Sequence, residues 1–126
     1  MVTLTTKMKH SLVEYVERLS QEVVVEKVVL FGSRVTKYAR PDSDIDLAII
    51  SPSFLGKRSV DVVAYLLSKA HKLGFDVSVE PLGFTPEEYG ENDPWGILDE
   101  IQQKGVIIFD NGRFLLKRGK KAKVFA

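Results

Sequence analysis

The spacing of hydrophobic and polar positions along the chain predicts helices that alternate with short apolar strands. Near the start, apolar side chains recur every three or four residues between charged ones, which is typical of an amphipathic helix over about 6–21. Thr5 or Thr6 can cap its beginning. Val23 to Phe31 is β-branched and apolar, and its second half predicts a buried strand. Residues 33–43 are polar and predict a short helix or a loop.

The middle of the chain continues this alternation. Ile45 to Ile50 predicts a second strand, Ser59 to Leu73 a second main helix, and Phe75 to Leu82 a third strand. Thr85-Pro86-Glu87-Glu88 has a threonine cap, a proline at the first helical position and a glutamate three residues after the cap, so a helix begins there. Asp93-Pro94 repeats the cap and the proline.

The last third of the chain predicts a helix and a hairpin. The helix ends at Gly105, and its apolar face is formed by Trp95, Leu98 and Ile101. Val106 to Phe109 predicts a fourth strand, and Asp110-Asn111-Gly112 is a turn signal after which Phe114-Leu115-Leu116 can pair back. Strands separated by helices indicate an α+β or α/β fold, and 126 residues fit a single domain over residues 1–126.

The amino-acid composition excludes several kinds of site. The absence of cysteine excludes disulfides, thiolate zinc sites and cysteine nucleophiles, and two histidines argue against a multi-histidine metal site. Because no apolar run approaches the length of a membrane span and the first residues lack a signal-peptide pattern, we expect a cytoplasmic protein that does not enter a membrane.

Charge is distributed unevenly between the body and the C-terminal segment. Residues 113–126 carry six basic side chains and no acidic one, whereas the rest of the chain is mildly acidic. This basic tail predicts either a solvated, frayed chain end or a contact for phosphates or an acidic partner. We do not expect nucleic-acid binding, since the body is acidic and the tail has few aromatic residues.

Two short segments carry the candidate chemistry. Gly32-Ser33 ends the first strand, and a glycine turn ahead of a helix start offers backbone amides and a hydroxyl for a phosphate. Asp44-Ile45-Asp46 opens the second strand, where residues two apart point to the same side. Two neighbouring carboxylates repel each other, and a hard divalent cation such as magnesium or manganese relieves that repulsion. The combination predicts metal-assisted phosphoryl or nucleotidyl transfer.

The same residues resemble a known family. Val29-Leu30-Phe31-Gly32-Ser33-Arg34 followed by Ala39-Arg40-Pro41-Asp42-Ser43-Asp44-Ile45-Asp46-Leu47-Ala48 is similar to the signature of the DNA polymerase β-type nucleotidyltransferase superfamily. It most resembles the minimal nucleotidyltransferases (MNT) of bacteria and archaea. The resemblance implies a mixed sheet of about four to five strands flanked by helices. It also implies a nucleoside triphosphate (ATP), two magnesium ions (or manganese) and transfer of a nucleoside monophosphate to a hydroxyl.

The resemblance also implies a role for each matching position. Gly32 and Ser33 would hold the triphosphate with Arg34 close by, and Asp44 and Asp46 would bind both metal ions.

A third carboxylate in the family helps to bind one metal ion and deprotonates the attacking hydroxyl. Glu80 and Asp76 are the two candidates, four residues apart on the same predicted strand. Glu80 is favoured because of its distance from the helix start at Thr85, and Asp76 stays the runner-up. Glutamate is one methylene longer than the usual aspartate, and residues 35–39 lack the glycine that many relatives place there.

Two functions are consistent with this resemblance, one as an enzyme and one as a binding protein. One is an active nucleotidyltransferase; relatives of this kind often accompany a small helical HEPN-type toxin as its antitoxin and add AMP to one of its tyrosines. The other is a catalytically weak or inactive module that neutralises a partner protein by binding it. Homo- and hetero-oligomers both remain open.

Overall fold

The computed structural model describes residues 2–91, 96–118 and 121–125. Its centre is one mixed sheet of six strands in the order β3-β2-β1-β4-β5-β6. β2 and β3 are parallel, and every other neighbouring pair is antiparallel. The strands are β1 (Lys27–Phe31), β2 (Ile45–Ile50), β3 (Val79–Phe84), β4 (Val106–Asp110), β5 (Arg113–Arg118) and β6 (Lys121–Val124). The predicted α+β class is confirmed, with one strand more than the expected four to five.

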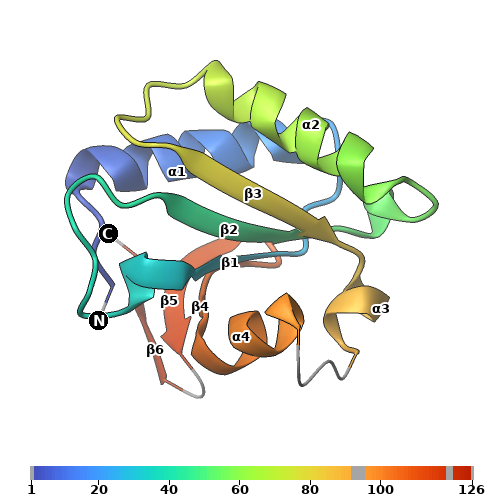
Figure 1. The fold of residues 1–126 in the computed structure, drawn as a ribbon. Coiled ribbons are helices and arrows are strands. Elements are labelled where there is room, and N and C mark those ends of the chain that lie inside the picture. Colours follow the sequence, from blue (N-terminus) through green and yellow to red (C-terminus); the bar gives the residue numbers. More distant parts are fainter. Residues whose placement is uncertain (1, 92–95, 119–120, 126) are drawn as a thin grey trace.

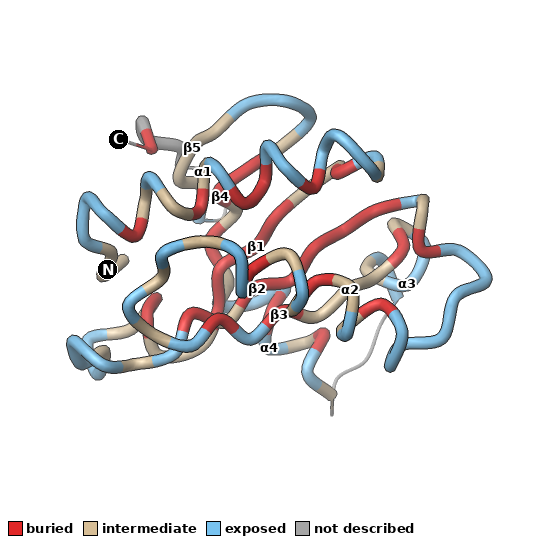
Figure 2. Tube along the Cα trace, turned by 90° about the horizontal axis from the view of Figure 1, so that it is seen from above, coloured by how far each residue is buried: buried red, intermediate tan, exposed pale blue. Residues whose placement is uncertain are grey.

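Helices cover both faces of this sheet (Figure 1). α1 (Thr6–Ser20) and α2 (Ser59–His71) lie on one face, and α3 (Pro86–Tyr89) and α4 (Ile97–Lys104) lie on the other. Short 3-10 helices, η1 (Gly32–Val35) and η2 (Pro52–Phe54), follow β1 and β2. Because both faces are covered, β1 and β2 are apolar throughout most of their length and nearly fully buried (Figure 2).

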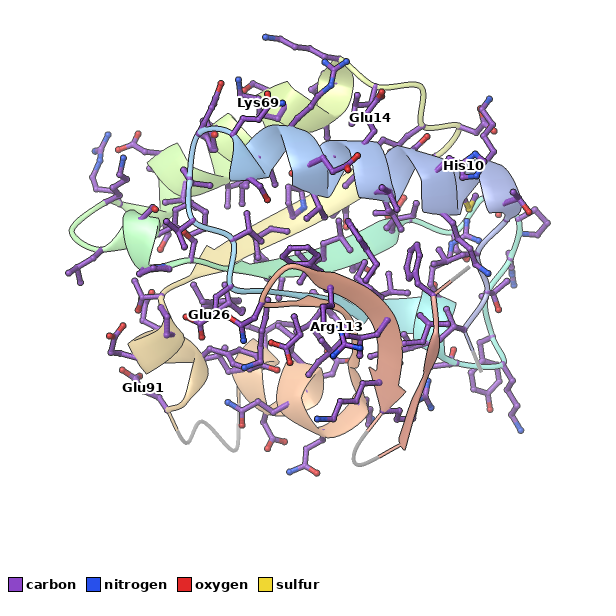
Figure 3. All side chains as sticks on the ribbon, turned by 180° about the vertical axis from the view of Figure 1, so that it is seen from behind. His10, Glu14, Glu26, Lys69, Glu91 and Arg113 are labelled. Atoms are coloured by element: carbon purple, nitrogen blue, oxygen red, sulfur yellow. The ribbon has the colours of Figure 1, made fainter. Side chains whose placement is uncertain are left out.

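Two apolar clusters form the core, one on each face of the sheet. The larger cluster lies under α1 and α2 and includes Leu12, Leu30 and Leu66, all fully buried. The smaller one lies under α4 and joins Val29 and Ile101. Polar side chains of α1, among them His10 and Glu14, lie on its exposed side (Figure 3). In the described part of the chain, no helix is long and apolar enough to cross a membrane.

Local sequence signals account for most element boundaries. Thr5 caps α1 by accepting a hydrogen bond from the Met8 amide at 3.1 Å. Thr85 and Glu88 form the reciprocal capping box that the sequence predicts for α3. Asn111 and Gly112 both have positive φ, 47° and 89°, which is the backbone of a two-residue hairpin turn between β4 and β5. The predicted start at Asp93-Pro94 and Trp95 lie outside the described residues.

Two expectations about strands are wrong. The third strand begins at Val79 and continues to Phe84, whereas the pattern predicts Phe75 to Leu82. It begins there because pairing with β2 starts at Ser78, whose carbonyl accepts from the Ile45 amide at 2.9 Å. The C-terminal segment is also not a frayed end, since β5 and β6 extend the sheet and Phe125 is buried in the larger cluster.

Candidate functional site

The bend between β1 and η1 lies directly against a carboxylate of β2. Gly32 has φ +76°, a conformation that L side chains rarely adopt. A Cβ built on Gly32 would overlap Asp46 Oδ2 and would lie 3.1 Å from Asp46 Cγ. Position 32 therefore requires glycine for two reasons: its backbone has a positive φ, and the Asp46 carboxylate occupies the space where a Cβ would lie. The Gly32-Ser33 bend and Asp46, fourteen residues apart, form one site.

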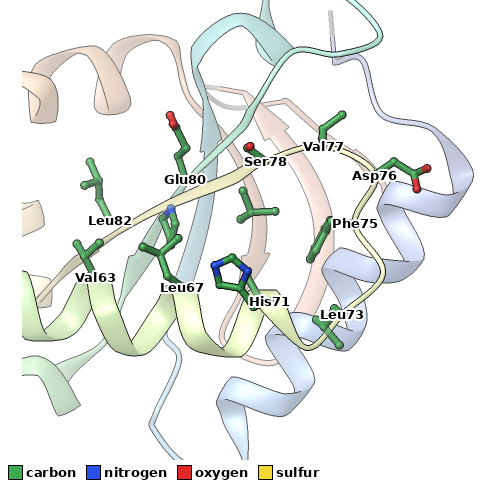
Figure 4. A pocket seen from close by; sticks show the side chains of 13 residues that line it. Val63, Leu67, His71, Leu73, Phe75, Asp76, Val77, Ser78, Glu80 and Leu82 are labelled. Atoms are coloured by element: carbon green, nitrogen blue, oxygen red, sulfur yellow. The ribbon is translucent and has the colours of Figure 1, made fainter.

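Asp46 also has an acidic neighbour on its other side. The parallel register of β2 and β3 sets Asp46 beside Glu80, and Glu80 projects from β3 on the side away from α2 (Figure 4). The pKa of Asp46 is raised to about 6, first by burial and then by the carboxylates of Glu80, Asp44 and Glu100. Three further carboxylates thus add to the negative potential at Asp46.

Asp76 is not part of this acidic site. It lies before β3 rather than on it, so the expectation that it shares a strand with Glu80 is wrong. Its carboxylate forms an exposed ion pair with Lys7 of α1 at 2.8 Å. Of the two candidates for a third carboxylate, only Glu80 stands in register with Asp46.

Arg34 lies inside the protein rather than at its surface. Its side chain is 1% exposed, and its guanidinium donates to the backbone carbonyls of Thr3 (3.2 Å), Pro41 (3.1 Å) and Ser43 (2.6 Å from Nη2). The resemblance implies a place for Arg34 close to the triphosphate. Because these carbonyls occupy the guanidinium, we interpret Arg34 as a positioning residue that holds the loop ahead of Asp44.

The loop between η1 and β2 is fixed by its own hydrogen bonds. The Thr36 hydroxyl donates to the Ser33 carbonyl at 2.8 Å and accepts from the Tyr38 amide at 3.1 Å. The Arg40 amide donates to the Ser43 hydroxyl at 2.8 Å. These contacts order a loop that lacks the glycine common in the resembling family. Tyr38 itself is 73% exposed, so it does not pack into the core.

The donor set suits a hard divalent cation. Asp46 and Glu80 are adjacent oxygen ligands, and within the described residues no lysine or arginine forms an ion pair with either of them. Burial first, and then the neighbouring carboxylates, raise the pKa of Asp46, and a bound cation would favour its charged form instead. No three acidic, histidine or cysteine side chains in the described ranges already converge as a metal cluster. The oxygen ligands of Asp46 and Glu80 fit the chemistry of a hard divalent cation. Binding such a cation requires the two carboxylate side chains to change their rotamers.

Glu100 is the acidic residue that sequence reasoning missed. It lies in the first turn of α4 and contributes to the raised pKa of Asp46. No sequence signal separates it from an ordinary solvent-exposed glutamate of an amphipathic helix. Only the packing of α4 against β1 places it near the site.

Comparison with known proteins finds a family and a similar solved structure. Residues 11–108 match the family described as nucleotidyltransferase domain, which includes the bend and all four carboxylates named above. The chain is also similar in fold to the crystal structure of a proposed nucleotidyltransferase from Sulfolobus solfataricus, with a TM-score of 0.60 and 20% sequence identity over 82% of this chain and 81% of that one. No curated protein matches.

Proposed function

Because this chain belongs to the nucleotidyltransferase domain family, we propose that it moves a nucleoside monophosphate, AMP from ATP, to a hydroxyl acceptor in a magnesium-dependent reaction. The contact between the Gly32 bend and the Asp46 carboxylate carries the proposal. It joins a turn suited to phosphate with an acidic pair suited to a divalent cation.

Each part of the site has a task in this reaction. The bend at Gly32 and Ser33 holds the triphosphate through backbone amides and the serine hydroxyl. Asp44, Asp46 and Glu80 would hold the magnesium ions (or manganese), which neutralise the charge of the phosphates when bound. Glu80 accepts the proton of the acceptor hydroxyl as its oxygen attacks the α-phosphorus. Pyrophosphate leaves on the opposite side.

We extend the proposal to a partner on the basis of the resemblance to minimal nucleotidyltransferases. The acceptor is then a tyrosine hydroxyl on a small helical HEPN-type toxin, and this chain acts as its antitoxin. The exposed position of Glu80 supports a macromolecular acceptor, because a protein side chain can reach it from solvent. Expression beside such a partner supplies the natural acceptor for the assay.

The test is transfer of label from α-³²P-ATP to a co-purified partner with and without magnesium. We expect labelling that requires magnesium, is lost with chelator and is lost in Asp44→Asn. Circular dichroism of the variant confirms an intact fold, because Asp44 is exposed and lies ahead of β2. Labelling that persists in Asp44→Asn contradicts the metal assignment.

One observation favours a second candidate, an inactive module that neutralises its partner by binding. The described residues contain no ready-formed three-carboxylate cluster. This candidate predicts no magnesium-dependent change in melting temperature with ATP, and equal partner binding by the wild type and Asp46→Asn. The active enzyme predicts a nucleotide-dependent shift that Asp46→Asn abolishes.

A further inference from the structure

The hairpin of β5 and β6 carries charge of one sign. Its described residues, 113–118 and 121–125, hold five basic side chains and no acidic one: Arg113, Lys117, Arg118, Lys121 and Lys123. Within the described residues, Arg113 and Lys117 belong to no ion pair. The proposed reaction uses none of these cations, so the charge of this basic hairpin is available to a binding partner.

One face of the basic hairpin is only partly covered. Phe114 and Leu116 pack on the larger apolar cluster. Because side chains alternate along a strand, Leu115 and Lys117 lie on the opposite face of the sheet. α4 lies on that face but packs on β1, and Leu115 belongs to neither apolar cluster of the described residues. Leu115 and Lys117 are only half-buried, so this face of β5 has room for a further contact.

The helices on that same face carry the opposite charge. The acidic segment consists of residues 85–91 and 96–103, which include α3 and all of α4 except its last residue, Lys104. It holds five acidic side chains and no basic one: Glu87, Glu88, Glu91, Asp99 and Glu100. α3 and α4 lie beside β5 and β6, below β1 and β2 in Figure 1. Ile97 in this segment is apolar and yet 43% exposed, so each charged surface includes an incompletely buried apolar residue.

A second copy of the chain matches this arrangement in sign and in number. Within the described residues, no ion pair joins the acidic segment to the basic hairpin of the same chain. When two copies face each other about a twofold axis, each basic hairpin meets the partner's acidic segment, and the two contacts are equivalent. Five basic side chains then face five acidic ones in each contact. This charge complementarity favours the orientation over those that bring like charges together.

We propose that two copies of this chain form a symmetric dimer through the basic hairpin and the acidic segment. The proposal does not depend on the transfer reaction. Ile97 and Leu115 contribute apolar contact area, and the charged residues around them set the orientation. Because most of the attraction is between exposed charges, the dimer weakens as salt screens them.

Sedimentation equilibrium of the full chain in chelator measures the dimer directly. In about 50 mM salt, the average mass is expected to rise from monomer toward dimer between about 5 and about 500 μM protein. In about 300 mM salt, the dissociation constant should be at least ~10-fold higher. A monomer at every concentration would overturn the proposal, and so would a dimer whose dissociation constant does not change with salt.

Reversing charges on each surface in a separate variant tests the pairing. Glu87→Lys with Glu91→Lys leaves the acidic segment nearly neutral, and Arg113→Glu with Lys117→Glu does the same for the basic hairpin. Each variant alone loses the complementarity of both contacts and should dimerise at least ~10-fold more weakly than the wild type. In a mixture of the two variants, one contact again joins an intact hairpin to an intact acidic segment. The mixture should therefore contain a heterodimer that is tighter than either homodimer.

Two controls separate the interface from general effects. Glu14→Lys with Glu17→Lys makes the same change of net charge on exposed positions of α1, which covers the other face of the sheet (Figure 1). The loss of dimer in Glu87→Lys with Glu91→Lys must exceed the loss in this control. Ile97→Ser should weaken the dimer about 5-fold, whereas Val24→Ser, at an apolar residue that is 63% exposed between α1 and β1, should not.

The remaining outcomes also decide the proposal. A mixture of the two charge variants that stays monomeric overturns it, and so does an equal loss of dimer in the α1 control. A dimer that neither Ile97→Ser nor the charge reversals weaken uses a different surface, which overturns it as well. None of these measurements involves transfer, so the result is independent of the proposed reaction.

Discussion

Gly32 and the carboxylate of Asp46 are in direct contact, with no room between them for even a methyl group. In Gly32→Ala we expect a loss of about 2 kcal/mol in the free energy of unfolding, because alanine is strained at positive φ and must also displace the carboxylate. Transfer activity should fall about 100-fold, since the displaced group belongs to the site. Urea unfolding and a labelled-ATP assay measure the two effects.

Gly112→Ala is the matched control for this change. Gly112 also has positive φ, 89°, but a Cβ there meets nothing within 4 Å. Its replacement should cost only the backbone strain, about 1 kcal/mol, and leave transfer unchanged. Equal activity losses in both variants would show that the Gly32 effect is a general loss of stability.

Asp46→Asn should stabilise the metal-free protein near neutral pH. The folded-state pKa of Asp46 is about 6, above the value near 4 of an unfolded chain, because burial and neighbouring carboxylates disfavour its charged form. The wild type therefore loses stability as pH rises from about 4 to about 6, and the asparagine variant does not. The full shift corresponds to about 3 kcal/mol, which screening of this part-exposed group reduces to about 1 kcal/mol.

Urea unfolding in chelator at several pH values measures this difference. The variant should be more stable above about pH 6 and equal to the wild type below about pH 4. Asp42→Asn, at an exposed carboxyl in the loop that precedes β2, is the control for replacing a carboxyl group by an amide. A stabilisation that grows toward low pH has the wrong sign for a raised pKa.

Glu80→Gln and Asp76→Asn separate the two candidates for the third carboxylate. Glu80 is the register neighbour of Asp46, so its amide variant should lose transfer by about 100-fold or more, the usual effect of removing a general base. Asp76 is paired with Lys7 at the surface, and its variant should change stability by no more than about 0.5 kcal/mol and keep its activity. A larger loss of transfer rate in Asp76→Asn than in Glu80→Gln would identify Asp76 as the third carboxylate.

Arg34→Lys should loosen the loop that ends at Asp44. A lysine ammonium keeps the charge but cannot reach the carbonyls of Thr3, Pro41 and Ser43 together, and leaving buried acceptors unpaired costs about 2 kcal/mol. Hydrogen exchange should rise in residues 36–44, and kcat should fall more than ATP affinity. Arg118→Lys is the control, because Arg118 is exposed and has one such contact, to the Val35 carbonyl.

Short-range patterns predicted those parts of the fold that short-range forces determine. The strand Ile45–Ile50 is confirmed at both ends, because its apolar run is bounded by Asp44 and by Ser51-Pro52. The capping box at Thr85 is confirmed, since its residues are adjacent in sequence. The start of β3 was placed too early because apolar and polar residues already alternate from Phe75 onward, and only pairing with β2 determines the first residue.

The part of the site that is formed by residues close in sequence could likewise be predicted. The Gly32-Ser33 bend and the Asp44 and Asp46 pair follow from local composition, and the structure brings the bend and Asp46 together. Glu100 and the burial of Arg34 could not be predicted, because both depend on segments that meet only in three dimensions. The turn signal at Asp110-Asn111-Gly112 predicted that Phe114-Leu115-Leu116 pairs back on the fourth strand, which is confirmed, whereas β6 was not predicted from the basic tail.

The link between Thr3 and Arg34 runs in both directions, since the Thr3 amide donates to the Arg34 carbonyl at 2.9 Å and the Thr3 carbonyl accepts from the guanidinium. The amino-terminal segment around Thr3 thereby holds Arg34 in place, and through it the loop ahead of Asp44. Proteolytic cleavage after Leu4 would spare the sheet and yet release this support. The cleaved protein should keep its melting temperature largely unchanged while the loop ahead of Asp44 becomes more mobile. Cleavage at this one site would therefore separate the stability of the fold from catalytic activity.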